Sequence, residues 1–119
     1  LKAAPAADIV TIGSISGLQN SPLNGASLPF FAAKHAQTGF ADGLRQELRG
    51  TTVRAHAIHP PNLDDVMPGT PAWVEAGSRG KSRHATVRQV VEAALFALTQ
   101  PRNVSLSILI DSDPGGVHG

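Results

Sequence analysis

The sequence of 119 residues contains no cysteine and no tyrosine, and only one methionine and one tryptophan. Without cysteine, the chain can form no disulfide, thiolate metal site or iron–sulfur cluster, and it has no cysteine nucleophile. Without tyrosine, it has no phenol to donate or accept a proton. Hydroxyl, imidazole, carboxylate and amine groups are left to carry any chemistry.

Charge is also sparse. Asp, Glu, Lys and Arg make up 16% of the residues, against about 25% in an average soluble protein. The 10 Lys and Arg residues nearly balance the 9 Asp and Glu residues, which gives a net charge of +1. Such a chain creates no overall field that would attract nucleic acid or an anionic membrane, so we expect neither as a partner.

Long hydrophobic runs are missing as well. No window approaches the roughly 18–20 apolar residues of a membrane span, and no charged segment followed by an apolar one opens the chain. We therefore expect a soluble, cytoplasmic protein. The length allows at most one compact domain. The chain begins at Leu1 rather than at a methionine, which suggests either that it is a piece of something longer or that its start was lost.

Apolar periodicity predicts strands alternating with helices. Residues 8–12 form a short β-branched run typical of a buried strand. Ser27 is placed to cap a helix over 30–49, with Pro29 in its first turn and Gly50 where a C-terminal cap would fall. A strand over 53–58, a helix over 86–99 and a strand over 104–110 follow, and residues 62–84 lack any steady period.

This order predicts an α/β fold with a parallel sheet, flanking helices and right-handed crossovers. About three strands and two main helices are expected, within one partial domain over 1–119. The segment 62–84 is predicted to be a long loop because it lacks a steady period. Loops of this length are usually functional or disordered.

Three short motifs occur in order along these elements. Ile12-Gly13-Ser14-Ile15-Ser16-Gly17 follows the first strand, Phe30-Phe31-Ala32-Ala33-Lys34 opens the first helix, and Ile58-His59-Pro60 ends the second strand. Together they resemble the short-chain dehydrogenase/reductase family, whose members have a Rossmann-like sheet. The resemblance runs from about residue 8 to about residue 111.

The resemblance implies an NAD- or NADP-dependent oxidoreductase acting on a small-molecule carbonyl or alcohol. Ser14 would orient the substrate carbonyl, and Lys34 would hold the cofactor ribose. Pro60, Pro61 and Leu63 would line the cofactor. Segment 62–84 would cover the substrate, and the helix over 30–49 would form a homodimer interface.

The sequence departs from the family at its proton donor. Phe30 stands where the family has its catalytic Tyr, and Phe has no ionisable group. Pro61 stands where a Gly is usual, and Asp65 stands near a usual Thr, where a carboxylate would repel a pyrophosphate. These departures predict an impaired or inactive enzyme. An alternative is a non-catalytic binding or dimerisation module, or a truncated relic.

The family's strand, Gly-rich turn and helix for the pyrophosphate have no counterpart before Asp8, so the resemblance covers only the second half of such an enzyme. Thr38-Gly39-Phe40-Ala41-Asp42-Gly43 superficially spells the Gly-rich turn, but it lies inside a predicted helix. Whether the cofactor is NAD or NADP stays open, because the residue that reads the ribose lies in the absent half.

Several residues keep a plainer interpretation beside the functional one. Ser14 suits an ordinary strand end, Lys34 a solvated helix and Phe30 simple packing. His56 and His59 are three apart on a strand and should point to opposite faces, so no metal site is predicted. Trp73 either lines a substrate pocket or packs within the loop. A solvated role and a contact with a cofactor phosphate or an acidic substrate are both open for the basic residues of the long loop: Arg79, Lys81, Arg83 and His84.

Overall fold

The computed structural model describes residues 6–18, 21–23 and 25–114. Strands β1 (Ala7–Ile12), β2 (Val53–His59) and β3 (Ser107–Leu109) form one parallel sheet in the order β1-β2-β3. All seven residues of β2 are buried. This burial follows from the position of β2 at the centre of the sheet, because a central parallel strand is covered on both faces.

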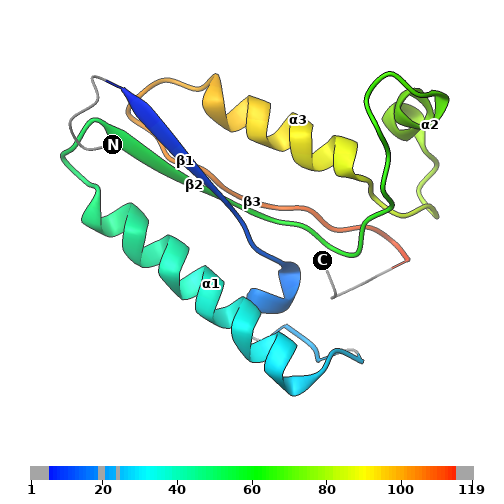
Figure 1. Ribbon diagram of the computed structural model, residues 1–119, viewed down its shortest axis with the longest axis horizontal. Helices are drawn as coiled ribbons and strands as arrows, with labels where there is room; N and C mark the ends of the chain where they lie inside the picture. Colours follow the sequence, from blue (N-terminus) through cyan, green and yellow to red (C-terminus); the bar gives the residue numbers. More distant parts are fainter. Residues whose placement is uncertain (1–5, 19–20, 24, 115–119) are drawn as a thin grey trace.

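Helices α1 (Leu28–Glu47) and α3 (Val87–Leu98) cover opposite faces of the sheet (Figure 1). On one face, Val53 and Ala55 pack against Leu48, next to the end of α1. On the other face, Arg54 donates to the carbonyl of Leu98, the last residue of α3. Because successive strand residues point to opposite faces, the sheet is the middle of three layers, as the sequence predicts.

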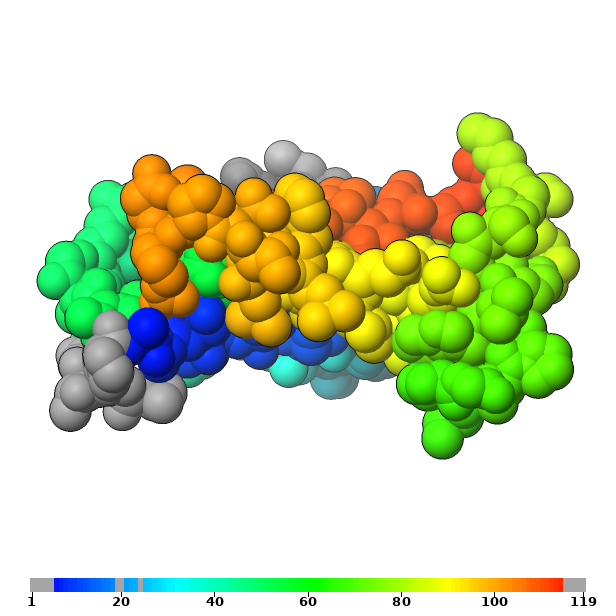
Figure 2. Space-filling model, turned by 90° about the horizontal axis from the view of Figure 1, so that it is seen from above, coloured from blue at the N-terminus to red at the C-terminus, as the bar shows by residue number. Residues whose placement is uncertain are grey.

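The two crossover connections have opposite hands. The strands follow one another across the sheet in chain order, yet their connecting helices lie on opposite faces. Followed through Figures 1 and 2, β1–α1–β2 is right-handed and β2–α3–β3 is left-handed. About 98% of such connections are right-handed, so the expectation from the sequence is wrong for the second one.

Local side-chain caps explain where the long helices begin. The Ser27 side chain accepts a hydrogen bond from the amide of Phe30 at 3.3 Å, and Pro29 lies in the first turn. After the helix, Gly50 has a φ of +78°, a conformation that favours glycine. Thr86 caps α3 through a reciprocal bond with Gln89. Both helices lie within about two residues of their predicted bounds.

Two segments differ from the prediction. Residues 62–84 contain a short helix α2 (Pro71–Glu75) and a 3-10 turn η2 (Ala76–Ser78), begun by a Thr70 cap. Strand β3 starts later than predicted because the Leu106 amide donates to the His56 ring at 3.0 Å and not to a backbone carbonyl of β2.

The described chain measures 43 × 36 × 18 Å along its principal axes. Figure 2 shows α3 (yellow to orange) running across the face turned to the viewer, with the residues around α2 (green) gathered at one end. None of the helices in the described ranges is long and apolar enough to cross a membrane.

A charged cluster ties the amino ends of the strands together. The Asp8 carboxylate accepts hydrogen bonds from Arg54 at 2.6 Å, His56 at 3.2 Å and Arg102 at 3.0 Å. The bond from Arg54 contributes most to lowering the pKa of Asp8 to about 2. We call these four residues the amino-end network.

Arg54 also completes the end of α3. Its guanidinium donates to backbone carbonyls at and just beyond the last turn, those of Leu98, Gln100 and Pro101, at 2.9–3.1 Å. The last carbonyls of a helix have no partner within the helix, so a buried guanidinium satisfies them. The side chain of Arg54 is only 5% exposed.

Candidate functional site

The residues predicted from the sequence motifs meet at the carboxyl end of the sheet. Beyond β1, the Gly13 amide donates to Ile58 at 2.8 Å and the Ile15 amide donates to Pro60 at 3.1 Å. Ser14 lies between these two bonds and is fully buried. In open parallel sheets, ligands bind beyond this end of the strands, so Ser14 and Pro60 occupy the expected position.

A short turn holds Ser14 in place. Its Oγ accepts the amide of Ser16 at 3.0 Å and caps the 3-10 helix η1 (Ile15–Gly17). Gly17 packs directly on the backbone of α1, where a β carbon would overlap the carbonyl of Lys34. The absence of a side chain at Gly17 therefore brings η1 against the turn of α1 that carries Lys34.

Phe30 and Lys34 lie one helical turn apart on α1, and both are half-buried. The Lys34 ammonium lies 5.4 Å from the centre of the Phe30 ring, within the range of a cation–π interaction. Phe30 therefore occupies the position next to Lys34 that the motif predicts. It supplies a ring face and no proton.

The remaining predicted residues follow β2. Pro60 and Pro61 are buried, Leu63 is half-buried and Asp65 is exposed. The segment then turns toward α3, where Asp64 forms a backbone bridge with Thr86. The contacts thus gather Ser14, Pro60 and Lys34, with Phe30 beside Lys34. They place Leu63 on the path that leaves the sheet.

The two histidines of β2 contact different partners. His56 accepts the Leu106 amide on Nδ1 and donates from Nε2 to Asp8, which fixes its neutral tautomer. The His59 Nε2 lies 3.3 Å from the hydroxyl of Ser107, and burial lowers the pKa of His59 while Asp42 opposes the shift. Among the described residues, no group of three or more His, Asp or Glu side chains converges on a metal position.

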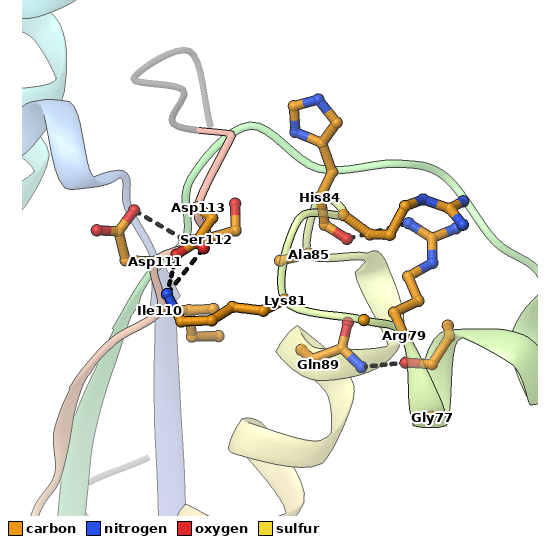
Figure 3. A pocket seen from close by; sticks show the side chains of 13 residues that line it. Gly77, Arg79, Lys81, His84, Ala85, Gln89, Ile110, Asp111, Ser112 and Asp113 are labelled. Carbon is orange, nitrogen blue, oxygen red and sulfur yellow. Dashed lines mark hydrogen bonds and ion pairs between the residues drawn. The ribbon is translucent and has the colours of Figure 1, made fainter.

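A cleft lies between the long loop and the tail that follows β3 (Figure 3). Its volume is about 370 Å³. We call it the loop–tail cleft. The residues that matter for its charge are Arg79, Lys81, Arg83, His84, Asp111 and Asp113.

The basic residues singled out in the loop all line this cleft, whereas Trp73 does not. Trp73 lies on α2, and the guanidinium carbon of Arg88 lies 5.9 Å from the centre of the Trp73 ring. The backbone carbonyl of Trp73 accepts a hydrogen bond from Arg88 at 2.8 Å. Sequence reasoning missed the carboxylates Asp111 and Asp113. Their position directly after a third parallel strand was the available signal, because such strands end at the same edge.

Arg79 is the structural cation of the loop. It donates to Glu75 and Asp64, both at 2.8 Å, and to the carbonyl of His84 at 3.0 Å. These bonds raise the pKa of Arg79 and hold the pKa of Asp64 below its ordinary value. Arg79 therefore ties the loop together and has little capacity left for a ligand.

Comparison with known proteins identifies relatives of this arrangement. The family model for short chain dehydrogenases matches residues 1–70. An uncharacterized oxidoreductase of Staphylococcus saprophyticus is 31% identical over 99 residues, which cover 83% of this chain and 38% of the relative. One from Staphylococcus epidermidis is 28% identical, over 83% of this chain and 39% of that protein. The chain spans about two fifths of the length of these relatives.

Solved structures share the fold. Serine dehydrogenase from Escherichia coli superposes with a TM-score of 0.63 at 25% identity, covering 90% of this chain and 40% of the enzyme. A 4-hydroxyisoleucine dehydrogenase complexed with NADH and succinate gives a TM-score of 0.63 at 22% identity, covering 88% and 44%. With the family model matching more than half of its residues, the chain belongs to the short-chain dehydrogenase family.

Proposed function

We propose that this chain carries the substrate-side part of an NAD(P)-dependent oxidoreductase site that interconverts a carbonyl and an alcohol, with proton transfer impaired by Phe30. One observation carries the proposal. On the two sides of Ser14, the Gly13 amide donates to the Ile58 carbonyl and the Ile15 amide donates to the Pro60 carbonyl, and Gly17 packs the same turn against the backbone at Lys34. A polar hydroxyl, a cation and two strand ends therefore share one edge of the sheet.

The residues present fit a nicotinamide cofactor in part. Lys34 is half-buried, and its ammonium lies beside the apolar ring of Phe30; an ammonium group can donate to ribose hydroxyls. Pro60 and Pro61 form a buried wall at the strand end. When bound, the nicotinamide supplies or accepts the hydride.

This chain's own groups account for orientation but not for proton transfer. In this proposal the Ser14 hydroxyl hydrogen-bonds a substrate oxygen, and the Lys34 ammonium holds the cofactor. Reduction of a carbonyl also needs a proton at the oxygen, which the Phe30 ring cannot provide. The proton must then come from water, and loss of a positioned acid typically costs about 10²–10⁴-fold in rate.

The substrate class draws support from two structural neighbours. Serine dehydrogenase and 4-hydroxyisoleucine dehydrogenase are both named for hydroxyl-bearing substrates. A structure of the first is complexed with NADP⁺ and one of the second with NADH. We carry over to this chain a hydroxyl or carbonyl substrate and a nicotinamide cofactor, with the choice between NAD and NADP left to measurement.

Titration of the chain with NADH and with NADPH, followed by cofactor fluorescence, tests the proposal. We expect saturable binding that weakens in Lys34→Met and not in Arg49→Met, whose side chain lies at the opposite end of α1. If the chain melts cooperatively but binds neither cofactor, the oxidoreductase proposal is wrong.

Restoring the phenol tests the chemistry. Phe30→Tyr should raise the rate of NAD(P)H-dependent carbonyl reduction by about 10²–10⁴-fold. Phe31→Tyr is the matched control, because Phe31 is the next residue of the same helix and its ring packs on His35. An equal rate in both variants would show that the Phe30 position is not the site of proton transfer.

A non-catalytic dimerisation module is the second candidate. The missing phenol at Phe30 supports this candidate. On α1, the Phe40 residue is 65% exposed and lies beside two glycines with open space around them. A second copy of α1 would cover this surface. Light scattering should then give twice the monomer mass, and Phe40→Glu should restore the monomer; a cooperatively folded wild-type monomer contradicts the idea.

A further inference from the structure

The loop–tail cleft has two walls of opposite charge. Lys81 and Arg83 lie on the loop between α2 and α3, and we call them the loop wall. Asp111 and Asp113 lie on the tail after β3, and we call them the tail wall. Figure 3 shows Lys81 extending from the loop toward the two carboxylates. The loop therefore contributes cations to the cleft and the tail contributes anions, and the Lys81 ammonium reaches across to Asp113.

The loop wall retains capacity to bind. Lys81 donates to the two oxygens of Asp113 at 2.9 and 2.8 Å, but its side chain is 87% exposed. Arg83 lies 3.4 Å from Glu75, a carboxylate that also binds Arg79. Exposed ion pairs of this kind contribute little. A ligand carboxylate can therefore replace these partners at low cost.

The tail wall has matching capacity. Asp111 accepts the neighbouring Ser112 amide at 2.8 Å and forms no ion pair within the described ranges. Among the residues that the structure describes, Asp113 is bound to Lys81 alone, and its side chain is 47% exposed. Carboxylates in this state are acceptors for an ammonium group.

The cleft adjoins the sheet edge that carries Ser14 and Pro60. The Ile110 amide donates to the His59 carbonyl at 3.0 Å, so the tail leaves the sheet beside the end of β2. Pro60 is the next residue after His59. The tail wall therefore starts one strand away from the candidate site, on the same edge.

We propose that the loop–tail cleft binds the charged end of a zwitterionic substrate, an amino carboxylic acid. Its carboxylate binds Lys81 and Arg83, and its ammonium binds Asp111 and Asp113. This inference rests on the proposed function, because it names the class of hydroxyl or carbonyl compound that the site takes. A plain anion is disfavoured because the tail wall repels it, and a plain cation is disfavoured because the loop wall does.

Three small probes separate these possibilities. L-Serine carries a hydroxyl with both charges, glycerate keeps the carboxylate and replaces the ammonium by a hydroxyl, and serinol keeps the ammonium and replaces the carboxylate. Titrations of the chain without cofactor, followed by amide shifts in NMR spectra, should give about tenfold tighter binding of L-serine than of either analogue. The shifted amides should include those of Lys81 and Asp111.

Charge-removing variants assign the two walls. Arg83→Gln should weaken L-serine binding about tenfold and leave serinol unchanged, whereas Asp111→Asn should weaken L-serine about tenfold and not weaken glycerate. Arg49→Gln and Glu47→Gln remove the same charges near the end of α1 and should have no effect. Because all four side chains are exposed, the variants should fold like the parent chain, which circular dichroism verifies.

Equal binding of L-serine and glycerate would overturn the proposal in favour of an anion site. No binding of any probe to the folded chain, or no effect of the two wall variants, would also overturn it and leave Lys81–Asp113 as a structural link. The readout is independent of NADH and NADPH binding. A chain that binds L-serine without binding cofactor would therefore contradict the proposed function alone, and the reverse result would contradict this inference alone.

Discussion

The two ends of the sheet treat charge differently. At the amino end, Arg54 is almost fully buried and its guanidinium is surrounded by Asp8 and the carbonyls that end α3. At the carboxyl end, Lys81 and Asp113 form an ion pair of similar length whose ammonium is largely exposed. Each pair joins segments far apart in sequence.

This difference in burial separates a structural role from a binding role. A buried charge with all its partners is expensive to disturb, since removing one partner leaves the others desolvated and unpaired. An exposed pair exchanges its partners with water and ligands at little cost. The amino end is therefore suited to hold the strands and α3 together, and the charged groups at the carboxyl end are free to exchange their partners for water or a ligand.

The largest effect is expected from Arg54→Met. The variant keeps much of the side-chain volume but removes the bonds to Asp8 and to the carbonyls at the end of α3, so we expect a loss of about 3–5 kcal/mol in the free energy of unfolding. Urea denaturation followed by circular dichroism measures it. Arg49→Met is the matched control, expected to change stability by less than about 0.5 kcal/mol.

A loss below about 1 kcal/mol in Arg54→Met would remove the contrast between the two ends. Total stability of a small domain is about 5–15 kcal/mol. The variant can therefore be partly unfolded without denaturant, and a chain that loses its cooperative transition altogether agrees with the prediction.

A smaller effect is expected from Gly17→Ala. The added methyl group would meet the Lys34 carbonyl and the Thr38 hydroxyl, so η1 must move off α1. We expect a loss of about 1–3 kcal/mol, as for an overpacked core position, together with weaker cofactor binding. Gly39→Ala is the control within α1, where nothing lies near the added carbon. It should stabilise the helix by up to about 1 kcal/mol, and equal effects of both variants would contradict the packing of η1 on α1.

Sequence reasoning predicted the elements whose signals are local. The period of α1, the Ser27 cap and the β-branched run of β1 each follow from neighbouring residues, and all three are confirmed. The family motifs also placed Ser14, Pro60 and Lys34 at one edge. Short-range patterns specify the local elements and the motif residues alike, because caps, periods and motif spacings extend over only a few residues.

What could not be predicted depends on contacts between distant segments. The amino-end network joins Asp8 to Arg102 across most of the chain, and no local pattern reports such a partner. The short β3 follows from one side-chain bond between His56 and Leu106. The left-handed crossover β2–α3–β3 runs against the statistical preference. Charged residues inside apolar strands, Asp8 and Arg54 here, were the signal available for the network.

Acid should weaken the amino end by a moderate amount. Asp8 has a pKa of about 2 in the folded chain against an ordinary value of 3.8. Its contribution to stability is therefore fully present above about pH 4 to 5 and is lost as the pH falls through 2. This lowering of the pKa corresponds to a contribution of about 2–2.5 kcal/mol.

Comparison with Asp8→Asn isolates this contribution. The stability difference between the parent chain and the variant, from urea midpoints, should shrink steadily from pH 5 to pH 2. Burial lowers the pKa of His59, so its protonation also destabilises the fold in acid, but it does so in both proteins and cancels. A difference that stays constant with pH would mean that the Asp8 charge is not coupled to folding.

The smallest effect is expected from Lys81→Ala. Its ammonium contacts Asp113 at 2.8 Å, close to the 2.6 Å between Arg54 and Asp8. The exposed lysine should nevertheless contribute less than about 0.5 kcal/mol to stability. The free energies of unfolding of the parent chain and Lys81→Ala, from urea denaturation, should agree within that margin at low salt. They should also agree in about 0.5 M salt, where the screening length is only a few Å. A loss above about 1 kcal/mol would make the pair a structural latch, and the two ends of the sheet would then differ in geometry but not in function. Agreement would mean that burial, and not the distance between the charges, decides which ion pairs hold this fold.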